Sequence, residues 1–270
     1  MKKIFYAGIF TIAICIYLSA CNSGTESAGT PPPPAPPIYN CVVQKTLPHD
    51  TSSFTEGLLI YNGSLYESTG NNGKSKLLKI DLNTGKIEKE LKLDSIYFGE
   101  GIAVLHDTIY QLTYKEPEIA FMYTLKDFKK IKELPFSTDT REGWGMTTDG
   151  TYLIASDGSS NLYYYEPSTF KLIKKILVTD AGTLSYNVNE LEYIDGYIYA
   201  NQWLLPYILK IDPANGQVVA KIDLTDLWNN IKQKDPHANV LNGIAYDSAS
   251  KKIYVTGKWW PELYEVQFSK

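Results

Sequence analysis

The sequence predicts an all-β fold, a five-bladed β-propeller in which an N-terminal strand closes the last blade. Three observations lead to this prediction. A segment pattern recurs about every 45 residues, which is typical of propeller blades. Each repeat holds four strand patterns, and the first strand of the domain supplies the one that the last repeat lacks. A predicted export signal and a linker precede the domain.

The first 20 residues predict a secretory signal peptide. Lys2 and Lys3 precede an almost wholly apolar run from Ile4 to Tyr17, as in the charged and apolar regions of such signals. The segment "LSAC" (18–21) resembles a bacterial lipoprotein signal, which implies cleavage before Cys21 and a lipid on its thiol. An uncleaved membrane anchor is the alternative, although the apolar run is shorter than the ~20 residues that a span needs. We therefore expect an exported protein that is lipid-anchored to the cell envelope, on its periplasmic or outer surface.

A proline-rich linker separates Cys21 from the globular domain. Residues 21–38 show no apolar periodicity, and their composition predicts a disordered, extended spacer. The domain follows over residues 39–270 and is long enough to bury a substantial core. It contains one cysteine, Cys41, so no internal disulfide is expected. The net charge of −4 and the lack of a basic stripe with interleaved aromatic residues argue against nucleic-acid binding.

Five similar segments begin with a small polar opening, followed by an apolar strand, a polar turn and a second strand. They are "FTEGLLIYNGSLYESTG" (54–70), "FGEGIAVLHDTIYQLTY" (98–114), "GWGMTTDGTYLIASDG" (143–158), "NELEYIDGYIYANQW" (189–203) and "NGIAYDSASKKIYVTGK" (242–258). Equivalent residues are Glu56, Glu100, Trp144, Asn189 and Asn242, spaced by 44, 44, 45 and 53 positions. The longer last step contains "LTDLWNNIKQKDP", which predicts a short helix from about Thr225 that Pro236 stops.

Two further strand patterns follow each of the first four openings. They occupy residues 77–91, 121–134, 162–176 and 207–222. The last repeat ends at Lys270 with its fourth strand missing, and "NCVVQKTLPHD" (40–50) resembles that outer strand. We expect the N-terminal strand to fill this place, because ring closure hides exposed strand edges.

The repeat positions predict where functional side chains meet. In a propeller the first strand of each blade lines the central channel, so the five openings converge on one mouth. The second strand returns antiparallel, and its equivalent end residues are Gly70, Tyr114, Gly158, Trp203 and Lys258. One mouth thus gathers two carboxylates, two amides, two tryptophans, a lysine and a tyrosine, while flanking glycines allow close backbone approach. The alternative is a hydrated channel mouth with both tryptophans in the core.

A series of motifs resembles one known family. They are "FTEGL", "ESTG", "YFGEGI", "EGWGM", "TDG", "SDGS", "NELEYIDG", "ANQW", "VLNGIAYD" and "TGKWWPELYEV", in order over nearly all of 54–264. The chain is similar to the plant-type glutaminyl cyclases, or glutaminyl-peptide cyclotransferases. This resemblance implies a five-bladed propeller enzyme that converts the N-terminal glutamine of peptides or proteins to pyroglutamate and releases ammonia. We expect no cofactor or metal.

The resemblance also implies residue roles. Glu100 is the expected catalytic acid/base, Trp144 and Trp203 wall the substrate pocket, and Asn189 and Lys258 are polar partners of the substrate. Further candidates for substrate binding are Glu56, Asn242 and Tyr114, and Glu56 stands where the family commonly has glutamine. The residue types suit the reaction, since one carboxyl group can take the proton of the attacking amine and give it to the departing nitrogen. Either Asn189 or Lys258 could stabilise the developing charge on the amide oxygen.

Two other functions are consistent with a propeller. A metal-dependent hydrolase such as a lactonase would gather carboxylates or histidines around an ion; Glu56, Glu100, Asn189 and Asn242 could hold calcium. The histidines offer little, since His106 falls in a turn at the far end of its blade and His49 and His237 are expected to be solvated. A surface-tethered binding propeller is the alternative without catalysis. The default expectation is a monomer.

Overall fold

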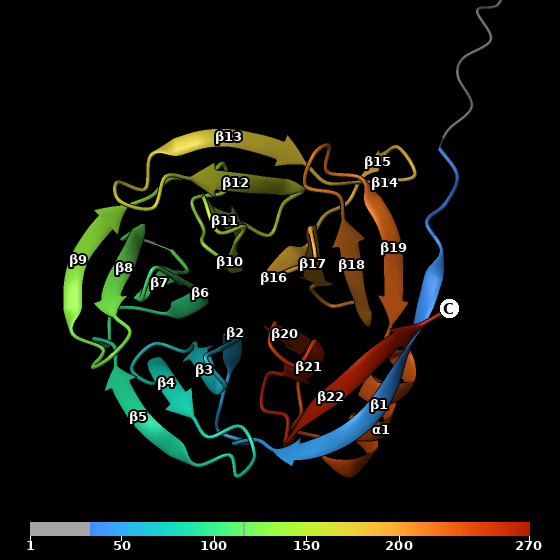
Figure 1. Ribbon diagram of the computed structural model, residues 1–270, viewed down its shortest axis with the longest axis horizontal. Coiled ribbons are helices and arrows are strands. Elements are labelled where there is room, and N and C mark those ends of the chain that lie inside the picture. Colours follow the sequence, from blue (N-terminus) through green and yellow to red (C-terminus); the bar gives the residue numbers. More distant parts are fainter. Residues whose placement is uncertain (1–32, 116) are drawn as a thin grey trace, which may run out of the picture. The chain divides into compact units, whose positions relative to one another are not determined.

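Antiparallel strands in sets of four make up nearly all of the structure. The computed structural model describes residues 33–115 and 117–270. The predicted signal peptide, Cys21 and the linker up to residue 32 lie outside the described residues. Figure 1 shows the sets following one another around a ring, with β2, β6, β10, β16 and β20 nearest its middle. The predicted all-β propeller is confirmed.

Three sets form separate four-stranded sheets. The first contains β2 (Thr55–Tyr61), β3 (Ser64–Thr69), β4 (Lys76–Ile80) and β5 (Ile87–Lys92). The second contains β6 (Gly99–Leu105), β7 (Thr108–Thr113), β8 (Ile119–Thr124) and β9 (Lys130–Pro135). The third contains β10 (Met146–Thr148), β11 (Leu153–Ser156), β12 (Asn161–Tyr165) and β13 (Leu172–Leu177). A small hairpin of β14 (Thr179–Asp180) and β15 (Thr183–Leu184) follows.

The other two sets share one eight-stranded sheet. One contains β16 (Val188–Ile194), β17 (Tyr197–Gln202), β18 (Tyr207–Ile211) and β19 (Val218–Asp223). The other contains β20 (Leu241–Asp247), β21 (Lys252–Gly257), β22 (Glu262–Ser269) and β1 (Ile38–Pro48).

Strand β1 closes the ring as the sequence predicts. It pairs antiparallel with β22, from Asn40 opposite Ser269 to Pro48 opposite Glu262. Its first residues also pair in parallel with β19, starting with Ile38 opposite Lys221. The sequence pattern did not indicate this second pairing, which joins the last two sets into one sheet and covers the outer edge of β19.

One helix, α1 (Thr225–Lys234), connects β19 to β20. Its buried residues Leu227 and Ile231 are four positions apart and therefore share one face. That face packs into a core cluster with Leu241 and Trp260. Asp235 is extended, as expected for the residue before a proline. The predicted start near Thr225 and the stop before Pro236 are both confirmed. No helix within the described part of the chain is long and apolar enough to cross a membrane.

The hydrophobic core lies between neighbouring sets of strands. One cluster joins Leu58 and Leu78 of the first set to Ala245 and Leu263 of the last. Outer strands are different: along β5 the side chains alternate between partly buried and exposed, which is typical of a strand with one solvated face. Each set therefore depends on its neighbours for burial, and the ring holds the inner strands in fixed mutual positions.

Candidate active site

A pocket of about 270 Å³ opens where the inner strands begin and the second strands end. Its lining residues are Phe54, Glu56, Phe98, Glu100, Tyr114, Trp144, Asn189, Trp203, Leu204, Asn239 and Lys258. Seven of these come from the set that the repeat positions bring together. Asn242 does not line the pocket; it lies behind Glu56.

Backbone irregularities aim the opening residues toward this pocket. The strand register shifts between Thr55 and Gly57, Gly99 and Ile102, Val188 and Leu191, and Leu241 and Ile244. A bulge of this kind redirects a side chain out of regular alternation. It explains why Glu56, Glu100 and Asn189 sit at the start of otherwise buried strands.

The glycine after each of the first three openings lets neighbouring sets approach closely. A Cβ on Gly101 would lie 2.3 Å from the backbone nitrogen of Met146, and one on Gly145 would lie 2.1 Å from the backbone carbonyl oxygen of Asn189. Neither distance is possible for a real side chain, so these positions require glycine. The glycines that flank Glu100 in the sequence therefore serve contacts between sets of strands.

Glu56 and Lys258 form a buried ion pair. The Lys258 Nζ lies 2.7 Å from Glu56 Oε1, and the two side chains are 8% and 3% exposed. Asn242 Nδ2 donates to Glu56 Oε2 at 3.3 Å and to the Thr55 carbonyl at 2.9 Å. Burial raises the pKa of Glu56 to about 7, although Lys258 opposes the shift. Both oxygens of this carboxylate are therefore occupied by protein donors.

Glu100 is buried beside this pair and lines the pocket. Burial, and then the charge of Glu56, raises the pKa of Glu100 well above its usual range. Glu100 also hydrogen bonds to Glu56, an interaction that lowers the pKa of Glu56 and raises that of Glu100. This interaction favours a proton on Glu100 over one on Glu56. Its Oε2 has no hydrogen-bond partner among the residues that the structure describes.

Two tryptophans form one wall of the pocket. The rings of Trp144 and Trp203 meet edge to face, with centroids 5.4 Å apart. Trp144 Nε1 donates to Glu142 Oε2 at 2.9 Å, and Glu142 in turn pairs with Lys115 at 3.1 Å. The indole of Trp144 lies over Gly158, where a Cβ would come within 2.5 Å. The wall is therefore fixed by packing and by a hydrogen bond.

Other aromatic residues complete the pocket. Tyr114 was predicted from the repeat positions, whereas Phe54 and Phe98 were not. Phe98 packs between Phe54 and Tyr114, with centroid distances of 6.1 Å and 5.5 Å. Phe54, Phe98 and Glu142 each stand two residues before an opening residue. This shared repeat position is the signal that could have identified them; Leu204 and Asn239 carry no such signal.

Asn189 and its neighbour Glu190 have different roles. Asn189 lines the pocket, and its Oδ1 is buried without a partner among the described residues. Glu190 turns to the central axis and accepts hydrogen bonds from Leu58 N at 3.2 Å and Ile244 N at 2.8 Å. Burial raises the pKa of Glu190 well above its usual range. Glu190 therefore ties together the strands beneath the pocket, a role that the sequence analysis did not assign.

The structure corrects the prediction that His49 is solvated. Its side chain is 2% exposed, and its Nε2 lies 3.2 Å from Glu67 Oε1, while Nδ1 lies 2.7 Å from the Trp260 carbonyl. Burial lowers the pKa of His49, but Glu67 outweighs it and raises the pKa overall. The prediction failed because the fold brings Glu67 and residue 260 against this loop. His237 is exposed, and His106 lies in the turn between β6 and β7, as predicted.

Metal-binding side chains do not cluster in the described structure. Within it, no group of three or more His, Cys, Asp or Glu side chains is placed to hold a metal ion. Cys41 lies in β1 beside a core cluster, and burial raises its pKa to about 12. Such a thiol behaves as a small apolar group.

Comparisons with known proteins agree on one chemistry. A family model described as glutamine cyclotransferase matches residues 12–268. A glutaminyl-peptide cyclotransferase of Arabidopsis thaliana is 38% identical over 260 residues, which are 96% of this chain and 80% of that protein. The crystal structure of a Myxococcus xanthus glutaminyl cyclase superposes with a TM-score of 0.80 at 34% identity, covering 87% of this chain and 98% of that one.

Proposed function

The chain belongs to the glutamine cyclotransferase family, and we propose that the pocket around Glu100 is its catalytic centre. The protein acts as a glutaminyl-peptide cyclotransferase: it converts an N-terminal glutamine to pyroglutamate and releases ammonia. The observation that carries the proposal is the buried Oε2 of Glu100, which has no hydrogen-bond partner among the described residues and lies next to a second carboxylate and an aromatic wall. Buried polar atoms without partners are rare and call for an explanation; a substrate proton is the explanation offered here.

The reaction requires one proton to change places. The neutral N-terminal amine attacks the side-chain amide carbon, a new C–N bond forms, and the bond to the amide nitrogen breaks. The attacking nitrogen loses a proton and the departing nitrogen gains one, so ammonia leaves. Because both nitrogens belong to the same substrate residue, orientation alone supplies much of the rate.

In this proposal Glu100 moves the proton. Its raised pKa favours the protonated carboxyl group, which can protonate the departing nitrogen and recover a proton from the attacking one. Glu56 accepts the hydrogen bond from Glu100 and holds Lys258 in place. The carboxylate of Glu56 thus stabilises the protonated form of Glu100.

Asn189 and Lys258 make the other polar contacts with the substrate in this proposal. The unpartnered group of Asn189 is its oxygen, which suits a substrate N–H donor. Lys258 spends one of its three N–H groups on Glu56 and still lines the pocket. We assign it to the amide oxygen, where negative charge develops. Trp144, Trp203 and Tyr114 enclose the glutamine side chain.

Replacing Glu100 with glutamine tests the assignment. Glu100→Gln keeps the size of the side chain but cannot exchange the proton, so kcat should fall by at least about a hundredfold. The measurement is ammonia loss from a short glutamine peptide, followed by mass spectrometry, with chelator present in a parallel reaction. Glu88→Gln, an exposed position outside the pocket, is the matched control.

Retained turnover in Glu100→Gln would remove Glu100 from the mechanism, and loss with chelator alone would favour a metal-dependent enzyme. No ammonia loss from any peptide would favour the tethered binding propeller.

A lipid anchor on Cys21 remains part of the proposal. It rests on the signal pattern that ends at Cys21. Cys21→Ala should move the protein from the membrane pellet to the soluble fraction while its specific activity is unchanged. Cell fractionation with immunoblotting measures this, and continued sedimentation with membranes would contradict a lipid at this cysteine.

A further inference from the structure

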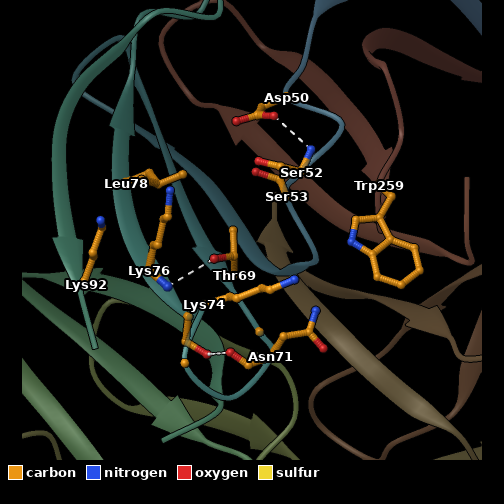
Figure 2. A pocket seen from close by; sticks show the side chains of 13 residues that line it. Asp50, Ser52, Ser53, Thr69, Asn71, Lys74, Lys76, Leu78, Lys92 and Trp259 are labelled. Carbon is orange, nitrogen blue, oxygen red and sulfur yellow. Dashed lines mark hydrogen bonds between the residues drawn. The ribbon is translucent and has the colours of Figure 1, made fainter. Parts of the chain in front are cut away.

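A second pocket of about 560 Å³ lies directly beside the active-site pocket. Its lining residues are Asp50, Ser52, Ser53, Thr69, Gly70, Asn71, Gly73, Lys74, Ser75, Lys76, Leu78, Lys92 and Trp259, and we call it the lysine pocket (Figure 2). Three lysines line it, Lys74, Lys76 and Lys92. The reaction described above leaves this pocket unused.

The two pockets share a wall. Phe54 lines the active-site pocket, and its ring centroid lies 4.8 Å from that of Trp259, which lines the lysine pocket. Gly70 lines the lysine pocket and touches the active-site residues: a Cβ there would lie 2.2 Å from Phe98 and 3.1 Å from Glu56 Cγ. The contacts of Phe54 with Trp259 and of Phe98 with Gly70 therefore lie between the two pockets.

The rim of the lysine pocket is held in an unusual backbone conformation. Trp259 has a φ of 62°, in the left-handed region that bulky residues seldom adopt, and Asn71 has a φ of 80°, a conformation that asparagine adopts more readily. The Trp259 N–H donates to the Ser53 carbonyl at 2.7 Å, and the Asn71 carbonyl accepts the Ser75 hydroxyl at 2.9 Å. Such strain persists only where surrounding contacts enforce it, and it concentrates at functional sites.

The charge of the pocket is opposite to that of the whole chain. Lys76 and Lys92 share one carboxylate, Glu90, at 3.0 Å and 3.7 Å. Lys74 has no ion pair within the described structure, and in Figure 2 its side chain extends across the pocket toward the side of Trp259. Asp50 is the one carboxylate that lines the pocket. The result is a positive site on a protein with a net charge of −4.

We propose that the lysine pocket binds the second to fourth residues of the peptide substrate and favours aspartate or glutamate there. The inference rests on the proposed function, which places the N-terminal glutamine in the neighbouring pocket. An extended peptide advances about 3.3–3.6 Å per residue, so two or three residues carry it past Phe54. The indole of Trp259 packs against the peptide, and the lysines pair with its carboxylates. The substrate class is therefore glutamine peptides with an acidic segment directly after the first residue.

Three matched peptides test this proposal: Gln-Ala-Glu-Glu-Ala, Gln-Ala-Ala-Ala-Ala and Gln-Ala-Lys-Lys-Ala, each with an amidated end. Ammonia release by the full chain gives kcat/KM for each. At low ionic strength the acidic peptide should exceed the lysine peptide about tenfold. The ratio should shrink in about 0.5 M salt, where exposed charges are screened.

Charge reversal at Lys74 supplies the decisive variant. Lys74→Glu should lower kcat/KM for the acidic peptide and raise it for the lysine peptide, and turnover of the latter shows that the variant is folded. Lys86→Glu is the matched control, because it makes the same charge change at the opposite end of the β4–β5 hairpin. Lys86 lies next to the Ile80–Ile87 pair, whereas the lysine pocket lies at the end where Lys76 pairs with Lys92. This control should keep the wild-type ratio.

Three outcomes would overturn the inference. Equal kcat/KM for all three peptides, or a preference that Lys74→Glu does not change, would exclude the lysine pocket as a subsite. A preference for apolar peptides that Leu204→Ser abolishes would place the peptide against Leu204, which lines the active-site pocket and not the lysine pocket. No ammonia release from any peptide would overturn the proposed function itself, and the subsite with it.

Discussion

At the scale of single residues, the proposed chemistry depends on three neighbouring ionisable side chains, those of Lys258, Glu56 and Glu100. Lys258 forms an ion pair with Glu56 and compensates the negative charge of that carboxylate. Glu100 lies next to Glu56. Two carboxyl groups so close cannot both ionise easily. Their proximity therefore favours a proton on Glu100, whose Oε2 has no hydrogen-bond partner among the described residues.

Glu56→Gln tests this arrangement. The change removes the charge that helps to raise the pKa of Glu100 and leaves Lys258 without its ion partner. The limb of the pH–kcat/KM profile that reports Glu100 should therefore move to lower pH. Activity should persist, since the family commonly has glutamine here. Ammonia release measured between pH 5 and 9 gives the profile, and an unmoved limb would show that Glu56 does not control Glu100.

At the scale of elements, the start of each inner strand determines what reaches the pocket. A register shift turns the opening residue toward the channel, and the following glycine lets the next set of strands approach. The fourth set departs from this pattern, because Glu190 occupies the glycine position and bonds across the axis. The register shift and the residue after it therefore shape the pocket in the first three sets, whereas in the fourth set Glu190 holds neighbouring strands together.

Gly101→Ala tests whether the device is structural. A Cβ at this position would lie 2.3 Å from the Met146 nitrogen, so the second and third sets must separate. The free energy of unfolding should fall by about 3 kcal/mol. Gly63→Ala is the control: its φ of 75° is also left-handed, but nothing lies within 4 Å, and the cost should be about 1 kcal/mol. Urea unfolding measures both, and equal losses would show that packing between sets is not the cause.

At the scale of the whole molecule, the carboxyl groups of buried Glu190 and partly buried Glu192 on β16 connect neighbouring inner strands. Glu190 reaches β2 and β20, and Glu192 accepts from Tyr246 N of β20 at 2.8 Å and from Thr147 Oγ1 of β10 at 3.4 Å. Strand β1 completes the ring from outside by pairing with β22 and β19. The frame is thus held at its centre by hydrogen bonds and at its edge by strand pairing.

These carboxyl groups should make stability depend on pH. Burial raises the pKa of Glu192 from 4.5 to about 8. Between these values the folded protein binds more protons than the unfolded chain, so the free energy of unfolding should fall as pH rises from about 5 to 8. In Glu192→Gln, which keeps the hydrogen-bonding shape without the titration, this fall should be smaller. Urea midpoints across the range measure it, and an identical slope in the variant would contradict the role of Glu192.

The sequence by itself determined the repeat, the closing strand and seven of the residues that line the pocket. Antiparallel pairing and a fixed repeat length place Glu56, Glu100 and Asn189 at equivalent positions before any coordinates are considered. The same holds for Trp203 and Lys258 at the ends of the second strands. Local pattern was sufficient here because strand geometry repeats from blade to blade.

Only the tertiary structure decided which partners these residues take. Lys258 binds Glu56 across 202 positions in the sequence, Asn242 lies behind the pocket rather than in it, and His49 is buried against Glu67. The parallel pairing of β1 with β19 is equally long-range. No local pattern carries these contacts, because they depend on how side chains from separate blades pack once the ring has closed.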